Sequence, residues 1–183
     1  MKKEKLRIND LSSLTYGKEG EEKFNALVDI LGEEVLSNPT YLKNKELIQH
    51  GCSSIFEHCH NVAIESLKIV ARFNIKCDIK SLVRGALLHD YFLYDWHDKD
   101  LDINLHGFYH PGIALRNAEK AFVLDDKEKE IIKKHMWPLT VVPPKCREAY
   151  VICYFDKTCT LKEVFKEWGV SLRKLMARGL VKK

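Results

Sequence analysis

Six histidine and aspartate positions have the residue types and the spacing of a metal site. Two of them, His89 and Asp90, are adjacent and follow the largely apolar run 82–88. Neighbouring residues on a helix point about 100° apart, so this pair can serve one centre only with ligands from other segments. The sequence offers such ligands on both sides of the pair, at His58, His110, His135 and Asp156.

The ligand types predict the class of metal. Imidazole nitrogens and carboxylate oxygens without thiolates suit borderline or hard divalent metals, here Fe, Mn, Co, Ni, Zn or Mg. Asp90 has two carboxylate oxygens and can bridge two ions, and six ligands exceed the need of one catalytic ion that also binds water. We therefore expect one or two divalent ions, with Asp90 as the catalytic residue among the ligands.

Each ligand also has a simpler structural interpretation. His89 and Asp90 could be a buried polar pair that satisfies its own hydrogen bonds, and Asp156 could pair with a cation on a neighbouring helix. His110 could simply lie near a helix start, and His135 at a helix end where the dipole favours it. We favour the metal because the residues fall on separate predicted elements, and helical proteins build metal centres from facing helices.

The first elements are predicted from apolar periodicity. Residues 1–20 are expected to form a loosely held arm. A helix over 21–36 should stop at Ser37-Asn38-Pro39, and a short helix should run from about Tyr41 to Gln49.

The helix that carries His58 begins with a capping signal. Ser54 and Glu57 have the spacing of a capping box, and the apolar pattern continues to about Phe73. His58 lies at the edge of the apolar stripe, whereas His60 lies well round the helix, so we favour His58 as the ligand.

The remaining ligands lie at predicted helix ends. Asp78 should cap the helix that leads to His89 and Asp90, and residues 91–102 read as an aromatic and acidic loop. His110-Pro111 should start a helix that reaches Phe122, since proline suits the first helical turn. Asp125 should start the next helix, which ends near His135.

A long helix is predicted at the C-terminal end of the chain. It covers Cys146 to Trp168 and includes Asp156, with Gly169 as its stop signal and a short helix over 172–177 beyond it. No convincing strand alternation is visible, so we expect an all-α fold, a compact multi-helix bundle with the metal site in its core. Residues 1–50 should form an arm and helical extension to the helical domain 51–183, as one compact unit.

Composition excludes several classes of protein. The chain has 183 residues and a formal charge of +4, with 30 Lys and Arg against 26 Asp and Glu, scattered except at the two ends. No basic stripe indicates a nucleic-acid polymer as partner, and no apolar run approaches the roughly 20 residues of a membrane span. Six cysteines without a CxxC pair favour reduced thiols, so we expect a cytoplasmic protein.

The ordered ligands resemble a known family. His58 stands before Val62-Ala63, the segment 86–90 reads Ala-Leu-Leu-His-Asp, and Asp156 stands between Phe155 and Lys157. In these features residues 50–165 resemble the HD-domain metal-dependent phosphohydrolase superfamily. His110 and His135 are similar to the two extra histidines of its branches with binuclear centres.

Two departures from that pattern concern the substrate. Many relatives have a phosphate-holding lysine where this chain has Leu93, and the Gly-Tyr-Pro signature of the cyclic-dinucleotide branch is absent after His135. We expect Lys157 to supply the missing cation, with Lys134, Lys145 and Arg84 as alternatives. His106 and Trp137 are further candidates for substrate contact.

The resemblance implies hydrolysis of a phosphate ester, with a nucleotide or another small phosphorylated metabolite as substrate. The metal ions would lower the pKa of a bound water and polarise the phosphoryl group. Two alternatives stay open at this point: a di-iron oxygenase of the HD type, and a non-catalytic HD module that binds a nucleotide and signals by a change of shape. The sequence does not determine the oligomeric state.

Overall fold

The computed structural model describes residues 18–50, 53–96 and 105–180. The helices are α2 (Lys18–Leu36), α3 (Pro39–Leu42), the 3-10 helix η1 (Lys43–Lys45), α4 (Ile55–Arg72), α5 (Ile79–Leu88), α6 (His106–Ala121), α7 (Asp126–Lys134) and α8 (Arg147–Leu180). Two short antiparallel strands, β1 (Ile48–His50) and β2 (Ser53–Ser54), precede α4. The all-α fold predicted from the sequence is confirmed.

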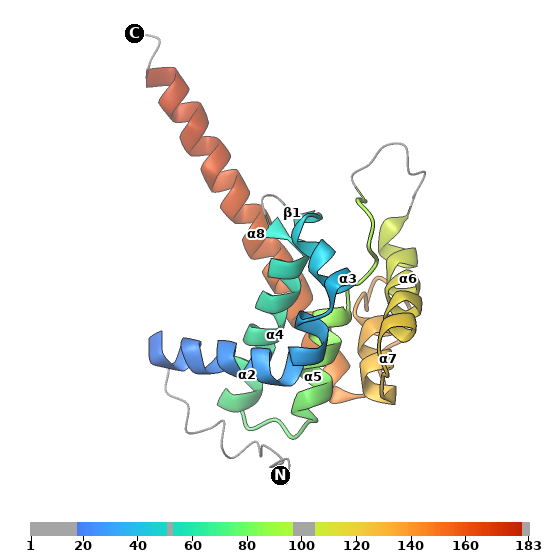
Figure 1. Ribbon diagram of the computed structural model, residues 1–183. Coiled ribbons are helices and arrows are strands. Elements are labelled where there is room, and N and C mark those ends of the chain that lie inside the picture. The colour runs from blue at the N-terminus through green and yellow to red at the C-terminus, as the bar shows by residue number, and fades with distance from the viewer. Residues whose placement is uncertain (1–17, 51–52, 97–104, 181–183) are drawn as a thin grey trace.

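Helices α4 and α5 form the centre of the bundle. They pack on each other, while α8 packs on α4, α7 on α5, and α2 across α5 (Figure 1). Helices α6 and α7 lie together on one side of α5, and the C-terminal half of α8 projects away from the other helices. One apolar cluster includes Val28 and Tyr41 from the N-terminal elements as well as Leu67, Leu87 and Ile152 from the later helices.

The capping residues act as the sequence predicts. Ser54 accepts a hydrogen bond from the Glu57 amide while the Glu57 side chain bonds back, so the capping box of α4 is complete. Asp78 caps α5. Asp125 and Glu128 form a second capping box at the start of α7. These contacts determine where the ligand-bearing helices begin.

The predicted helix from Tyr41 to Gln49 is wrong beyond Lys45. The chain leaves η1 and forms β1, which pairs with β2 through Ile48 opposite Ser54. The Ile55 amide also donates to the Leu47 carbonyl, at 2.8 Å. Strand pairing with residues 53–54 overrides the local helical preference. This pairing places residues 48–50 beside the start of α4.

Two predicted helix boundaries are also wrong. Helix α6 begins at His106 and contains Pro111, although Pro111 was expected in the first turn. Helix α8 is continuous through Gly169, so residues 172–177 are not a separate helix. A glycine inside a helix costs about 1 kcal/mol relative to alanine, which is too little to stop a helix without a cap.

Some expectations lie outside the described residues. These are most of the N-terminal arm, residues 1–17, and the part of the acidic loop from residue 97 to residue 102. Among the described helices, none combines the length and the apolar character that a membrane span requires.

Candidate metal centre

The structure brings all six predicted ligands together in the core. His58 lies in the first turn of α4, His110 in α6 and Asp156 in α8. His89 and Asp90 follow the last residue of α5, and His135 follows the last residue of α7. All six side chains are buried.

The six residues form two groups that share one carboxylate. The first group is His58, His89, Asp90 and Asp156, and the second group is Asp90, His110 and His135. Within each group one potential ligand atom per residue lies within 4.8 Å of all the others. Each group could hold a metal ion, because imidazole nitrogens and carboxylate oxygens face one another at this range.

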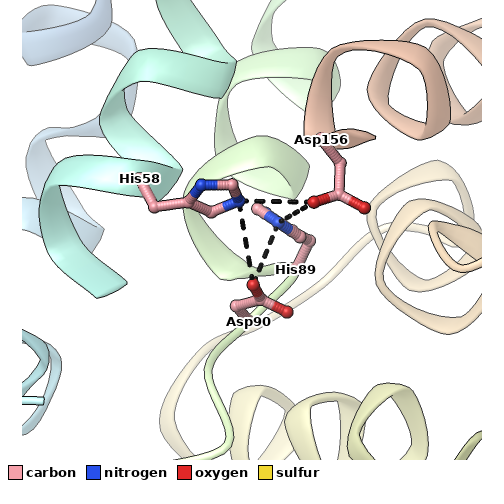
Figure 2. Close-up of side chains that lie close together, drawn as sticks. All are labelled: His58, His89, Asp90 and Asp156. Carbon is pink, nitrogen blue, oxygen red and sulfur yellow. Dashed lines mark hydrogen bonds and ion pairs between the residues drawn. The ribbon is translucent and has the colours of Figure 1, made fainter. Parts of the chain in front are cut away.

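In the first group, two carboxylates face two imidazoles (Figure 2). His58 Nε2 lies 3.3 Å from Asp156 Oδ1, and His89 Nε2 lies 3.3 Å from Asp90 Oδ2. The crossed distances are 3.7 Å from His89 Nε2 to Asp156 Oδ1 and 3.9 Å from His58 Nε2 to Asp90 Oδ2. Four side chains from α4, the end of α5 and α8 therefore converge on one small volume.

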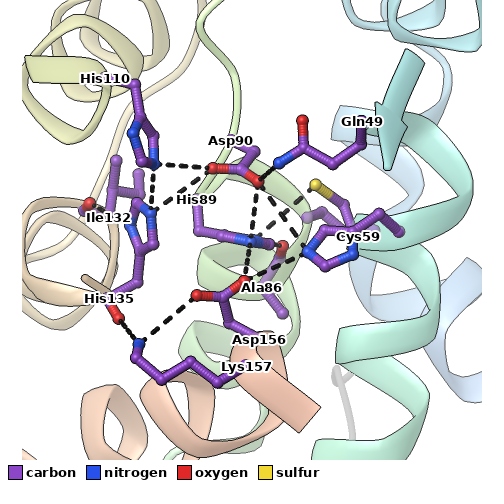
Figure 3. Close-up of polar contacts among 12 residues, drawn as sticks. Gln49, Cys59, Ala86, His89, Asp90, His110, Ile132, His135, Asp156 and Lys157 are labelled. Atoms are coloured by element: carbon purple, nitrogen blue, oxygen red, sulfur yellow. Dashed lines mark hydrogen bonds and ion pairs between the residues drawn. The ribbon is translucent and has the colours of Figure 1, made fainter. Parts of the chain in front are cut away.

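In the second group, the other oxygen of Asp90 faces two histidines (Figure 3). Asp90 Oδ1 lies 3.2 Å from His110 Nε2 and 3.5 Å from His135 Nε2. The two Nε2 atoms of His110 and His135 are only 2.7 Å apart. Asp90 thus directs Oδ2 to the first group and Oδ1 to the second, as a bridging carboxylate would.

Backbone carbonyls determine the tautomers of three histidines. His89 Nδ1 lies 2.7 Å from the Ala86 carbonyl oxygen, His110 Nδ1 3.0 Å from that of His106, and His135 Nδ1 2.9 Å from that of Ile132. A carbonyl only accepts, so each Nδ1 carries a proton and the neutral ring keeps its lone pair on Nε2. Histidines that ligate metals commonly donate their other ring N–H in this way.

The convergence leaves two buried polar atoms without a regular hydrogen bond. His89 Nε2 and Asp90 Oδ1 are fully buried and make no hydrogen bond of regular geometry among the described residues, although Asp90 Oδ2 lies 3.3 Å from the first and His110 Nε2 3.2 Å from the second. Buried polar atoms of this kind are rare, because each costs about 1–3 kcal/mol. A cation between the lone pairs would satisfy both atoms, so the residues present fit a metal.

Electrostatics set the charge states of the ligands. Burial would raise the pKa of Asp90 and of Asp156, but the neighbouring histidines hold both well below the usual range. Burial, helped by His110 and His89, lowers the pKa of His135 to about 3. At neutral pH the carboxylates are therefore ionised and His135 is neutral, which are the forms that bind metals.

The pKa of His58 shifts in the opposite direction. Burial alone would lower it, but hydrogen bonds with Asp156 and Glu163 outweigh burial and raise it to about 10. The pKa of His89 is likewise raised, because Asp90 outweighs the effect of burial. At these two rings a metal ion would take the place of a proton.

The predicted substrate residues lie around the groups. Lys157 Nζ donates to the His135 carbonyl at 2.8 Å and lies 3.6 Å from Asp156 Oδ2. His106 stacks on His110 with ring centroids 4.5 Å apart. Trp137 follows close after His135, and its ring meets that of Tyr150 edge-on. Neither His106 nor Trp137 belongs to either group.

The alternative cation Arg84 is occupied elsewhere. Its guanidinium is buried and binds Glu128, Glu34 and the Val123 carbonyl. Of the candidates expected to replace the lysine missing at Leu93, Lys157 has its ammonium group beside a potential metal ligand.

Two residues at the centre were not predicted. Gln49 Nε2 donates to Asp90 Oδ2, and Glu163 binds His58 Nδ1 at 3.1 Å. Glu163 follows Asp156 by two helical turns, so the pattern of α8 could have revealed it. Gln49 could not be found in this way, because it lies in the strand that was predicted as helix.

Comparisons with protein-family models, with curated proteins and with solved structures found no significant match for this chain.

Proposed function

We propose that the protein is a divalent-metal-dependent phosphohydrolase that acts on a nucleotide or another small phosphate ester. The single observation that carries the proposal is the convergence of four histidine Nε2 atoms on two buried, ionised carboxylates, with His89 Nε2 and Asp90 Oδ1 lacking a regular hydrogen bond. Histidine and carboxylate ligands around a shared Asp are suited to a pair of divalent ions.

The two groups differ in the number of protein ligands. The first group has four residues and the second has three, with Asp90 common to both. Catalytic sites commonly keep three protein ligands and leave a position for water or substrate. We therefore assign substrate binding to the side of the second group, formed by α6 and α7.

Divalent ions lower the pKa of a bound water and polarise a phosphoryl group for in-line attack. The chain's own contribution is to hold the ligands in place and to balance charge. Asp90 ties the two groups together, and the Lys157 ammonium, which approaches Asp156 at 3.6 Å, supplies the cation for the phosphate. The resemblance to the HD superfamily supports the same assignment.

The test begins with protein purified without added metal. Elemental analysis is expected to find one or two equivalents of a divalent metal per chain. The same sample, with its metal restored, is expected to release phosphate from at least one member of a panel of phosphomonoesters, phosphodiesters and nucleotides. The variant Asp90→Ala serves as the control and should lose both metal and activity. Metal-loaded protein that cleaves nothing in the panel would refute the hydrolase proposal.

A di-iron oxygenase is a second candidate, because the same nitrogen and carboxylate ligands suit iron. The observation in its favour is the nitrogen-rich second group, in which two imidazoles accompany the shared Asp90. Iron-dependent oxygen consumption without phosphate release would select this function. Nucleotide binding by metal-free and inactive protein would instead indicate a non-catalytic module.

A further inference from the structure

The contact made by the Nδ1 atom of His58 differs from those of the other three histidines. His89, His110 and His135 each place Nδ1 against a backbone carbonyl three or four residues earlier in the chain. His58 Nδ1 instead meets the carboxylate of Glu163, at 3.1 Å to one oxygen and 3.3 Å to the other. The orientation of His58 thus depends on a side chain from another helix.

The two carboxylates closest to the ring nitrogens of His58 come from one face of α8. Asp156 and Glu163 are separated by two helical turns, and they contact opposite nitrogens of the same ring. The Glu163 side chain is only 9% exposed, so water screens this contact weakly. Helix α8 therefore supplies Asp156 as a candidate ligand. Two turns later it supplies Glu163, whose carboxylate contacts the Nδ1 atom of His58.

We propose that Glu163 is a positioning residue, which fixes the Nδ1–H tautomer of His58 and strengthens Nε2 as a donor to the metal of the first group. The inference rests on the proposed metal centre. A carboxylate that accepts the far N–H of a ligating imidazole orients the ring and raises its basicity. Carbonyls do the same for the other three rings, but only the Glu163 contact adds a negative charge.

A simpler explanation is that Glu163 merely holds α8 against α4. The chain offers a matched control for this, because Glu65 lies on α4 two turns after His58 and also faces α8. Glu65 Oε2 lies 3.5 Å from Lys162 Nζ, and Glu65 has no contact with the ligands among the described residues. Glu65→Gln removes a carboxylate at the same helix interface without touching the centre.

The experiment compares wild-type protein with Glu163→Gln and Glu65→Gln. Each is loaded with Zn²⁺ and titrated against a chelator to obtain the affinity of each ion. Glu163→Gln should lower the affinity for one ion about 10- to 100-fold and leave the affinity for the other nearly unchanged. A loss of this size is typical when the hydrogen-bond partner of a ligand is removed. Glu65→Gln should keep both affinities. Equal weakening in the two variants, or none in Glu163→Gln, would overturn the inference.

Nitrogen NMR of ¹⁵N-histidine-labelled, Zn²⁺-loaded protein provides a readout that a purely structural role would not change. In the wild type, His58 should show a protonated Nδ1 and a metal-bound Nε2. This measurement needs no variant, so it holds even if Glu163→Gln fails to fold. A proton on Nε2 of wild-type His58 would contradict the role of Glu163. If the wild type binds no metal at all, the proposed metal-dependent function is refuted. That result is distinct from one in which the wild type binds metal but Glu163 does not affect it.

Discussion

Asp90 is the residue on which both groups depend, since its two oxygens face different histidines. We predict that Asp90→Asn loses both ions, because an amide has a single, neutral oxygen and cannot bridge them. His110→Asn should lose only the ion of the second group, since His110 lies outside the first group. Equilibrium dialysis followed by elemental analysis measures both stoichiometries.

The comparison of Asp90→Asn with His110→Asn distinguishes a shared metal centre from two independent polar clusters. Retention of one ion in Asp90→Asn would show that this carboxylate is not the bridge. Loss of both ions in His110→Asn would show that the groups bind as one unit. Circular dichroism of both variants checks that the helices remain, so that metal loss is not confused with unfolding.

At the scale of elements, Glu148 joins three helices. Its Oε1 accepts hydrogen bonds from the Asp78 amide at the start of α5 and from Lys127 in α7, both at 2.7 Å, while Glu148 itself lies in the first turn of α8. Burial would raise the pKa of Glu148, but these two donors lower it below 4.5. The folded state therefore binds this proton less readily than the unfolded chain.

We predict that Glu148→Gln lowers the free energy of unfolding by about 1.5–3 kcal/mol at pH 7, the range for hydrogen bonds to charged groups. The contribution is present above the unfolded pKa and is lost as the pH falls through the folded pKa. The difference from wild type should thus shrink as the pH falls below about 4.3, the ordinary pKa of a glutamic acid, as measured by urea denaturation. Glu119→Gln, which removes an exposed pair with Lys129, should cost less than about 1 kcal/mol.

Gly85 allows α5 and α7 to approach closely. A Cβ atom at this position would lie 2.5 Å from Ile131 Cδ1, 2.9 Å from Cγ2 and 3.0 Å from Cβ. The Cβ atom of Ile131 cannot swing away, because it is bonded directly to the backbone of α7. Helix α7 must therefore shift to admit a methyl group, and α7 leads directly to His135.

We predict that Gly85→Ala destabilises the protein despite the gain of about 1 kcal/mol in helix propensity, because overpacking costs about 1–3 kcal/mol. The substitution should also lower the affinity for the ion of the second group. Gly112→Ala in α6 is the control, since its Cβ would meet only Arg116 Nη1 at 3.8 Å and should be neutral or stabilising. Thermal unfolding and metal titration of both variants test the prediction, and a stabilised Gly85→Ala would contradict it.

Local signals predicted the helix starts well because caps act within one turn. Ser54, Asp78 and Asp125 each bond to an amide three residues later, so nothing distant is needed to find them. The strand at Ile48 depends on pairing with Ser54 instead, which periodicity does not reveal. The early start of α6 likewise accompanies ring stacking between His106 and His110, which appears only once the segment is helical.

At the scale of the whole molecule, the residues of the buried cluster could be predicted while the residues that support it could not. A histidine or aspartate within an apolar stretch of sequence is a candidate ligand whatever its position in the fold. Gln49 is recognisable only from its contact with Asp90, and Glu163 only once Asp156 has been identified on the same face of α8, because a glutamine or glutamate is ordinary on any surface. Residues that hold ligands are therefore harder to find in a sequence than the ligands themselves.

The candidate ligands come from α4, the ends of α5 and α7, α6 and α8, so ions in the two groups would together link five of the helices, three at each group. Without metal, the carboxylates of Asp90 and Asp156 and the histidines around them are held together only by their contacts with one another. We predict that a chelator lowers the melting temperature of wild-type protein, because a ligand that binds only the folded state stabilises it by about 2.7 kcal/mol at 100 times its Kd.

The decisive comparison is with Asp90→Asn under the same conditions. The variant lacks the bridge between the groups, so chelator should change its melting temperature little, and added Zn²⁺ should not raise it. In the wild type, restoring the metal should recover the lost stability in full, as linkage between binding and folding requires. An equal response in the two proteins would mean that chelator acts elsewhere on the chain, and the buried cluster would then be a network of ion pairs and not a metal centre.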